Sequence, residues 1–443
     1  MRILHVNKFM YRRGGAEGYL LDVAALQRHA GHEVGFWGMQ HPENERPQPL
    51  GDTFAPYVEL EPAPGGVAGV AAAARMVWSP ASAAGIRVAL ERFRPDVVHC
   101  HNIYHQLSPS ILRPIARAGV PCVMTLHDYK LACPSYQMLA AGAPCDACVG
   151  HSAWHAAAKR CKGGSLAGSV VLSLESSIHR SLRLYDGVDH FVSPSRFLAG
   201  VMGSQGIPGE RISVVSNFTA MRPDHERADP GTGIVFAGRL SHEKGVDDAI
   251  RAIALASRGL ILHVAGDGPR RAELEDLAVE LAPGRVRFHG RLDADSLATL
   301  VAGCRALVLP ATWYENQPMT ILEAYAVRTP VIVTSMGGLP ELVDHGRHGL
   351  VVPPNDPVSL AAAMDRLQAE PELALAMGAA GRMRLEQEFD AQTHLERLDA
   401  VYKLAALHHR TRERRGGRTS RRRDAPIRPG ATDSTTTTKD DAV

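Results

Sequence analysis

Two glutamates, Glu315 and Glu323, give the strongest chemical signal in this 443-residue chain because both are expected to be buried near a helix start. Residues 306–310 have the pattern of a short buried strand, and residues 321–326 that of a helix. Pro318 suits the first helical position, where no backbone N–H is needed, so Glu315 is expected in the loop and Glu323 in the helix. The alternative is an ordinary loop acid and a solvated helix acid.

The start of this predicted helix is a candidate phosphate site. Its first backbone N–H groups, around Met319 and Thr320, have no partner within the helix, and the helix dipole attracts an anion there. The two glutamates could then bind hydroxyl groups of the molecule that carries the phosphate.

A second candidate site is the segment 238–245, which follows the first predicted strand of the second half. Arg239 and Lys244 are two cations that could offset the charge of a pyrophosphate leaving group. An exposed charged turn is the alternative, but ligands favour the carboxyl ends of parallel strands. Residues 266–269 and 337–341 end two further strands at the same edge of the sheet, so together they indicate a nucleotide pocket, although a plain turn would explain either one.

The first half of the chain offers two further candidates. Gly15 lies between a strand and a helix, where glycine lets backbone N–H groups approach a phosphate, although a tight turn would also explain it. The absence of G-x-G-x-x-G spacing around it argues against a dinucleotide dehydrogenase. His127 follows a predicted strand over 120–125 and could donate to a sugar hydroxyl or a phosphate, although a structural role is the alternative among 21 histidines.

Strands and helices alternate along the chain, which predicts an α/β protein with two doubly wound, Rossmann-like domains facing across a cleft. The predicted domains are 1–216, with a cysteine-rich insert over 130–165, and 217–385; a helix over 386–408 would return to the first domain, and 409–443 would be a disordered basic tail. The predicted strands are 3–7, 33–37, 97–100, 120–125, 234–237, 260–265, 286–289, 306–309, 330–334 and 350–352, and the predicted helices of the first half are 17–30 and 84–93.

The composition is that of an ordinary soluble protein, with 45% hydrophobic and 22% charged residues. The net charge is +2, but residues 410–443 hold nine arginines and one lysine against five acids, so the remainder is slightly acidic and unsuited to nucleic acid. No apolar run reaches membrane-spanning length. We expect a cytoplasmic enzyme whose tail either contacts anionic lipid at the inner membrane face, at about 1 kcal/mol per basic residue, or has no role.

Four cysteines, Cys133, Cys145, Cys148 and Cys161, are separated by 11, 2 and 12 residues. Thiolates at this spacing could close a tetrahedral structural zinc site, with His151 or His155 as substitute ligands. A buried, reduced set of thiols is the alternative, and disulfides are disfavoured in the cytosol.

Taken together, these motifs make residues 1–405 similar to the retaining glycosyltransferases of family 4, which have the GT-B fold. The matching segments are 14–17, 125–128, 238–245, 266–269, the Glu315/Glu323 pair, and 337–341. Two departures are Phe218, where many members have glycine, and the 315–318 segment, which replaces a glycine-rich version.

The resemblance implies a role for each candidate residue. Arg239 and Lys244 would hold the diphosphate of a UDP- or GDP-linked donor, with the Gly15 backbone close by. Glu323 would bind the ribose, and Glu315 and His127 the transferred sugar. The other implied donor contacts are Asn217, Gly238, Gly266, Asn316, Met319 and Thr320. No cofactor is required for the chemistry that the resemblance implies.

The resulting hypothesis is transfer of a sugar, with retention of anomeric configuration, to a glycan, lipid-linked or small-molecule hydroxyl in polysaccharide or glycoconjugate synthesis. A nucleotide-sugar epimerase of the same fold is one alternative, and product analysis without acceptor would distinguish it. A non-catalytic nucleotide-sugar-binding protein is the other, although it would not need both Glu315 and the Arg239/Lys244 pair.

Overall fold

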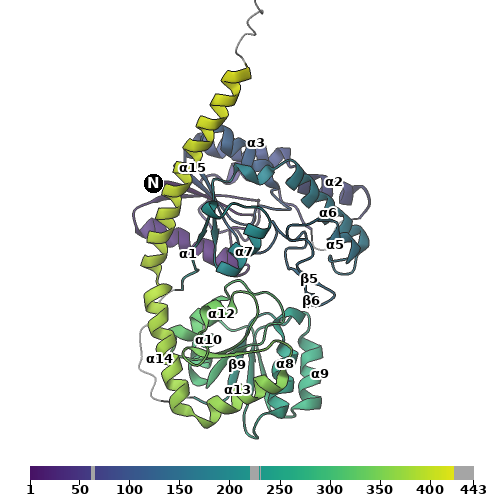
Figure 1. Cartoon of the computed structure of the whole chain (residues 1–443), viewed down its shortest axis with the longest axis vertical. Helices are drawn as coiled ribbons and strands as arrows, with labels where there is room; N and C mark the ends of the chain where they lie inside the picture. The colour runs from purple at the N-terminus through teal and green to yellow at the C-terminus, as the bar shows by residue number, and fades with distance from the viewer. Residues whose placement is uncertain (61–64, 220–228, 230, 424–443) are drawn as a thin grey trace, which may run out of the picture.

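The computed structural model describes residues 1–60, 65–219, 229 and 231–423. Figure 1 shows two lobes, one for each half of the chain, with two long C-terminal helices running along one side of both. Within the described residues, no helix is long and apolar enough to cross a membrane.

The first half folds around a six-stranded parallel sheet with the order β2-β1-β3-β4-β7-β8. Its strands are β1 (Arg2–Val6), β2 (Glu33–Trp37), β3 (Val97–Cys100), β4 (Cys122–Thr125), β7 (His190–Ser193) and β8 (Ile212–Val214). β3, β4 and β7 are buried along their whole length, as expected for a parallel sheet covered on both faces. The first four strands agree with prediction to within two residues; β7 and β8 were not predicted because they are short and partly polar.

Helices and a small hairpin surround this sheet. The helices are α1 (Gly15–His29), α2 (Gly66–Val77), α3 (Pro80–Phe93), α4 (Leu112–Arg117), α5 (His155–Ala158), α6 (Leu166–Ser181) and α7 (Arg196–Ser204). The hairpin pairs β5 (Leu139–Ala140) with β6 (Ala143–Pro144) and lies inside the cysteine-rich insert.

The second half folds around another six-stranded parallel sheet, with the order β11-β10-β9-β12-β13-β14. Its strands are β9 (Ile234–Ala237), β10 (Leu262–Ala265), β11 (Val286–Gly290), β12 (Ala306–Leu309), β13 (Val331–Thr334) and β14 (Gly349–Val352). Its helices are α8 (Val246–Leu255), α9 (Arg271–Leu281), α10 (Ala294–Gly303), α11 (Met319–Ala326), α12 (Leu339–Leu342), α13 (Pro357–Ala369) and α14 (Pro371–Glu388). All six strands agree with the predicted ranges to within two residues.

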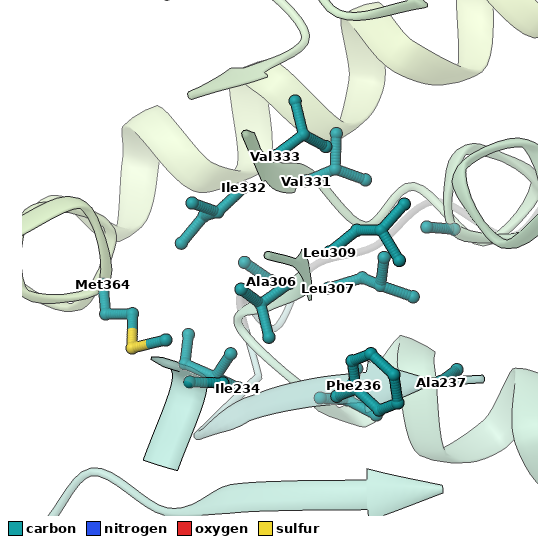
Figure 2. Close-up of a cluster of buried hydrophobic side chains, with 14 of the residues drawn as sticks. Ile234, Phe236, Ala237, Ala306, Leu307, Leu309, Val331, Ile332, Val333 and Met364 are labelled. Atoms are coloured by element: carbon teal, nitrogen blue, oxygen red, sulfur yellow. The ribbon is translucent and has the colours of Figure 1, made fainter. Parts of the chain in front are cut away.

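Buried side chains hold the central strands of this second sheet in place. Figure 2 shows side chains of β9, β12 and β13 packed together, with Met364 of α13 beside Ile234 of β9. The chain order reverses between β9 and β12, which are neighbours in the sheet. A crevice at the carboxyl ends of two such strands is the usual ligand site of an open α/β sheet, so the loops after β9 and β12 are where the site is built.

The C-terminal helices differ from the prediction of one helix over 386–408. α14 ends at Glu388, and a separate helix, α15, runs from Ala391 to Arg423. Asp390 separates them because its carboxylate accepts the N–H groups of Gln392 and Thr393 at the start of α15. α15 packs against α1, β4 and β7 of the first sheet.

α15 also continues through part of the segment predicted to be a disordered tail from residue 409. His409 is buried, and the buried carboxylate of Asp189 lies 3.0 Å from His409 Nδ1 and 3.0 Å from Arg412 Nη1. These contacts stabilise the helix beyond residue 408. Apolar periodicity in the sequence does not show them. Residues 424–443 lie outside the described residues, and membrane contact by the basic segment stays a prediction.

Replacing Arg412 by Gln should lower the free energy of unfolding by about 2 kcal/mol, because it removes a charged hydrogen bond from a buried carboxylate. Arg410→Gln is the matched control: Arg410 is exposed on the same turn, so its effect should stay within about 0.5 kcal/mol. Urea denaturation of both variants measures the difference. Equal effects would show that the Asp189 contact does not anchor the helix.

Candidate active site

Lys244 and Glu315 form the centre of the candidate site. Lys244 ends the short 3-10 helix η5 (His242–Lys244) after β9, and Glu315 lies in the loop after β12, so two adjacent strands bring them together. Lys244 Nζ lies 2.5 Å from Glu315 Oε1, and the glutamate side chain is only 7% exposed. The ammonium also lies 5.2 Å from the centre of the Trp313 ring, a favourable cation–π distance. The structure thus pairs two residues to which the resemblance gives separate roles.

Glycines let neighbouring loops press against the loop that carries Glu315. Gly245 has a φ of 66°, and a β-carbon on it would lie 1.9 Å from the carbonyl oxygen of Pro310. Gly337, with a φ of 60°, would place a β-carbon 2.3 Å from the carbonyl oxygen of Glu315. The Gly338 N–H donates to that same oxygen at 2.6 Å. The backbone around Glu315 is therefore held from two sides by segments that accept no side chain.

Gly238 and Gly266 bring two neighbouring loops into backbone contact. A β-carbon on Gly266 would lie 1.8 Å from the carbonyl oxygen of Gly238, so the two loops touch backbone to backbone. The Gly238 N–H donates to Ala265 at 3.0 Å, and the Gly266 N–H donates to Gly290 at 2.7 Å. Neither N–H is therefore available to a phosphate, and a donor contact at these two glycines through other atoms stays a prediction.

The helix start that was predicted as a phosphate site is the start of α11, and it lies one residue later than predicted. Pro318 is the N-cap and precedes the helix, which begins at Met319. No side chain caps this end, and the hydroxyl oxygen of Thr320 is buried without a hydrogen-bond partner in the described part of the chain. Glu323 lies inside α11 as predicted, but its side chain is exposed, whereas Glu315 is buried.

Two further predicted residues, His127 and Asn217, lie where the two halves meet. The side-chain amide of Asn316 donates to the His127 carbonyl oxygen at 3.1 Å. Gln317 brackets the backbone of Asn217: its Oε1 accepts the Asn217 N–H at 2.6 Å, and its Nε2 donates to the Asn217 carbonyl at 3.2 Å. The loop after β12 therefore connects Lys244 on one side to His127 and Asn217 on the other.

A cleft of about 950 Å³ adjoins this region, lined mostly by the first half of the chain and by Arg239. Arg239 is exposed, and its guanidinium has no ion-pair or hydrogen-bond partner among residues that the structure describes. A β-carbon on Gly15 would meet nothing within 4 Å, so the backbone there is open, and its predicted contact with the donor stays a prediction. Lys244, Glu315 and His127 are not among the residues that line this cleft.

Asp128 lines the same cleft and was not singled out from the sequence. Its carboxylate accepts hydrogen bonds from the Tyr104 hydroxyl and from the Lys130 N–H, the latter at 2.9 Å. Burial raises the pKa of Asp128 to about 6. Its position directly after His127, at a strand end, was the signal that could have identified it.

Two family models match adjacent parts of the chain. A model described as "Glycosyl transferase 4-like domain" matches residues 14–217, and one described as "Glycosyl transferases group 1" matches residues 217–384. A glycogen synthase of Mycobacterium tuberculosis is 33% identical over 319 residues, which are 71% of this chain and 70% of that protein. This chain belongs to the group 1 glycosyltransferases and has the GT-B fold.

Other similar proteins agree with this assignment. A 2-deoxystreptamine glucosyltransferase of Streptomyces kanamyceticus is 28% identical, covering 67% of this chain and 74% of its own. Anabaena HepE, solved in complex with UDP and glucose, has a TM-score of 0.62 at 18% identity and covers 91% of this chain and 99% of its own. Sucrose-phosphate synthase of Thermosynechococcus elongatus has a TM-score of 0.65 at 18% identity, with 91% and 98% coverage. The predicted family and fold are confirmed.

Sequence reasoning missed a group of buried histidines in the first sheet of the glycosyltransferase. His5 on β1 and His99 on β3 are direct partners in the strand register, and His101 follows two residues later. One ring nitrogen of each histidine lies within 4.8 Å of one ring nitrogen of the other two. Among the described residues, this is the one group of three His, Cys, Asp or Glu side chains placed so closely. The signal was present in the sequence, since two adjacent parallel strands both carry histidine near their carboxyl ends.

The four cysteines of the insert lie near one another but do not form a closed metal site. Cys133 and Cys148 are buried, and Cys145 and Cys161 are half-buried. Burial, followed by the neighbouring Cys133 thiol, raises the pKa of Cys148 to about 12. However, no three of the four sulfur atoms lie within 4.8 Å of one another. To bind one zinc ion, the sulfur atoms would have to move closer together.

Gly245→Ala should destabilise the glycosyltransferase by clearly more than the cost of a left-handed backbone alone. Gly284→Ala is the matched control: Gly284 has a φ of 72°, and a β-carbon there meets nothing within 4 Å. Both variants cost about 1–2 kcal/mol for the backbone, but only Gly245→Ala forces the loops after β9 and β12 apart. Chemical denaturation measures the free energy of unfolding of both variants. Equal decreases would contradict the prediction, because they would mean that the two loops move apart at little cost.

Proposed function

We propose that this glycosyltransferase transfers a sugar from a UDP- or GDP-linked donor to an acceptor hydroxyl with retention at the anomeric carbon. The observation that carries the proposal is the Lys244–Glu315 pair, placed at the carboxyl ends of β9 and β12 beside the uncapped start of α11. A diphosphate would compete with Glu315 for the Lys244 ammonium and would receive the N–H groups of Met319 and Thr320. The exposed Arg239 supplies a second cation near the same strand end.

In the proposed reaction the bond between the anomeric carbon and the diphosphate oxygen breaks. The acceptor oxygen bonds to that carbon on the same face, and the acceptor proton passes to the departing phosphate oxygen. Arg239 and Lys244 stabilise the charge that develops on the diphosphate. Glu315 binds the transferred sugar, and the exposed Glu323 binds the ribose of the donor.

The cleft lined by Asp128 and Arg239 is the proposed acceptor site, because it adjoins the donor region and its volume is about 950 Å³. That volume lies near the upper end of the range for ligand pockets, so it can take more than one sugar ring. A glycan acceptor in polysaccharide or glycoconjugate synthesis, either free or lipid-linked, therefore fits better than a single small molecule. Asp128 would accept a hydrogen bond from an acceptor hydroxyl.

A thermal-shift panel of nucleotide sugars, with and without oligosaccharide acceptors, tests this function. The correct donor at about 100 times its Kd should stabilise the native state by about 2.7 kcal/mol. Transfer of sugar, with the anomeric configuration of the product read by NMR, should follow for that donor only. Conversion of the donor to a different nucleotide sugar without acceptor would favour an epimerase instead, and stabilisation without any turnover would favour a binding protein.

Replacing Lys244 by Met should reduce kcat/KM by about 10²-fold, the scale of one lost preorganised electrostatic contact. It should also lower stability, because it leaves the buried Glu315 carboxylate without its cation. The double variant Lys244→Met/Glu315→Gln separates the two effects: stability should return while turnover stays low. Lys403→Met, at an exposed lysine of α15, is the control.

Recovery of turnover in that double variant would contradict the proposed role of Lys244 in catalysis. Unchanged stability in Lys244→Met would instead show that Glu315 does not depend on the pair. Circular dichroism and enzyme kinetics on the same samples supply both readouts.

We also propose that the four insert cysteines bind one structural zinc ion. The four thiols lie within electrostatic reach of one another, since Cys133 and Cys145 raise the pKa of both Cys148 and Cys161. A cation between them would remove that repulsion, provided the sulfur atoms move to about 2.3 Å from it. Metal analysis of the reduced protein should find about one zinc per chain.

Cys145→Ser should lose this zinc and lower the melting temperature, whereas Cys100→Ala, outside the insert, should keep it. Protein without stoichiometric zinc after expression in zinc-supplemented medium would remove the zinc proposal and leave four reduced thiols. The transferase proposal does not depend on this result.

A further inference from the structure

A continuous chain of hydrogen bonds runs through the buried part of the first domain and ends at His127. Gln27 Nε2 donates to the Tyr402 hydroxyl of α15 at 2.8 Å, and Gln27 Oε1 lies 2.7 Å from His5 Nε2. His5 Nδ1 lies 3.0 Å from His101 Nε2. His101 Nδ1 in turn lies 2.9 Å from His127 Nε2. Each ring therefore contacts the next through a different nitrogen.

The amide at the start of this chain fixes the direction of every bond in it. Because the Gln27 amide nitrogen donates to Tyr402, its Oε1 is the acceptor, and His5 must carry its proton on Nε2. A neutral imidazole has one donor and one acceptor, so His5 Nδ1 accepts and His101 Nε2 donates. The same rule makes His101 Nδ1 an acceptor and His127 Nε2 a donor. His127 Nδ1 then keeps its lone pair.

Tyr402 is compatible with this orientation of the Gln27 amide. Its hydroxyl lies 2.9 Å from His99 Nδ1, while His99 Nε2 lies 2.7 Å from the Thr125 hydroxyl. The hydroxyl can therefore accept from Gln27 and donate its own proton to His99. Tyr402 is buried, so no water competes for either bond.

Burial keeps the rings of this chain neutral, so each ring has one donor and one acceptor nitrogen. It lowers the pKa of His5 and of His127 to about 4, and it lowers that of His101 well below the usual value. A bound cation is the competing explanation for three clustered histidines. Both ring nitrogens of His5 and His101 are already hydrogen-bonded, and the grouping holds no carboxylate to offset a buried divalent charge, so hydrogen bonding is favoured.

We propose that Gln27, His5 and His101 are positioning residues that hold His127 as the Nε2–H tautomer, so that its Nδ1 accepts a hydrogen bond from a hydroxyl of the transferred sugar. His127 Nδ1 has no partner among residues described by the structure, and the residue is partly exposed, two positions after β4 ends. The sugar contact rests on the proposed function, but the tautomer is a property of the free protein.

This arrangement has a consequence for donor choice. A ring nitrogen that can only accept selects a sugar with a free hydroxyl at that position over a deoxy or O-methyl analogue. Sites that hydrogen-bond a substrate hydroxyl discriminate strongly against analogues that lack it, because a buried polar group is left unpaired. The prediction therefore concerns the class of donor sugar as well as the state of the histidine.

Nitrogen-15 NMR of the histidine-labelled wild-type protein tests the tautomer directly. The His127 signal, assigned by its loss in His127→Gln, should show the proton on Nε2 and an unprotonated Nδ1 at pH 7. A proton on Nδ1, or a charged ring, would overturn the proposal. This measurement needs neither substrate nor activity, so it is decided independently of the proposed function.

Gln27→Met tests the role of the chain in the reaction, because it removes the acceptor that fixes the direction of the bonds. The His127 tautomers should become mixed, and kcat/KM for the donor should fall roughly tenfold, the scale of one hydrogen bond. Ser213→Ala is the control: it removes the partner, 2.9 Å away, of another buried histidine, His190, on the same sheet. It should change neither the tautomer nor kcat/KM.

Three outcomes of the variant experiment are distinct. Mixed tautomers with unchanged kcat/KM would refute the sugar contact. An unchanged tautomer in folded Gln27→Met would refute the role of the chain. A wild-type protein with the expected tautomer but no transfer to any acceptor would refute the proposed function and leave the chain of hydrogen bonds standing.

Discussion

The close contact between Lys244 and Glu315 is the constraint on which the rest of the site depends. A carboxylate as buried as Glu315 must be paired, because an unpaired buried charge costs several kcal/mol. The pairing fixes the loops after β9 and β12 at one distance, and glycines on both sides let neighbouring backbone close around them. The same pairing keeps a cation at the carboxyl ends of the strands, where a phosphate can compete for it.

The loop that carries Glu315 also joins the two halves of the glycosyltransferase. Asn316 and Gln317, the next two residues, bind the backbone of His127 and Asn217 in or beside the first domain. Three consecutive residues, 315–317, therefore connect Lys244 to the backbone of His127 and Asn217. This connection gives donor binding a direct physical route to the histidine that is proposed to contact the sugar.

Local pattern was sufficient to predict ten of the twelve strands in the two parallel sheets, because burial of a parallel strand leaves an apolar run that the sequence shows plainly. It was not sufficient for features that depend on contacts between distant residues. The continuation of α15 depends on Asp189, and the direction of the histidine chain depends on Gln27 meeting Tyr402, 375 residues later. The backbone contact between the loops of Gly238 and Gly266 is a further example, since local sequence does not show which loop lies beside a glycine.

The most direct test of the account is the affinity of Glu315→Gln for the nucleoside diphosphate alone, measured by isothermal titration calorimetry. If the Glu315 carboxylate and a diphosphate compete for Lys244, the neutral variant should bind the diphosphate more tightly than the wild type, by roughly tenfold, even though its sugar transfer is impaired. Equal or weaker binding of the diphosphate to Glu315→Gln would contradict the account, because it would show that Lys244 is not shared between the two.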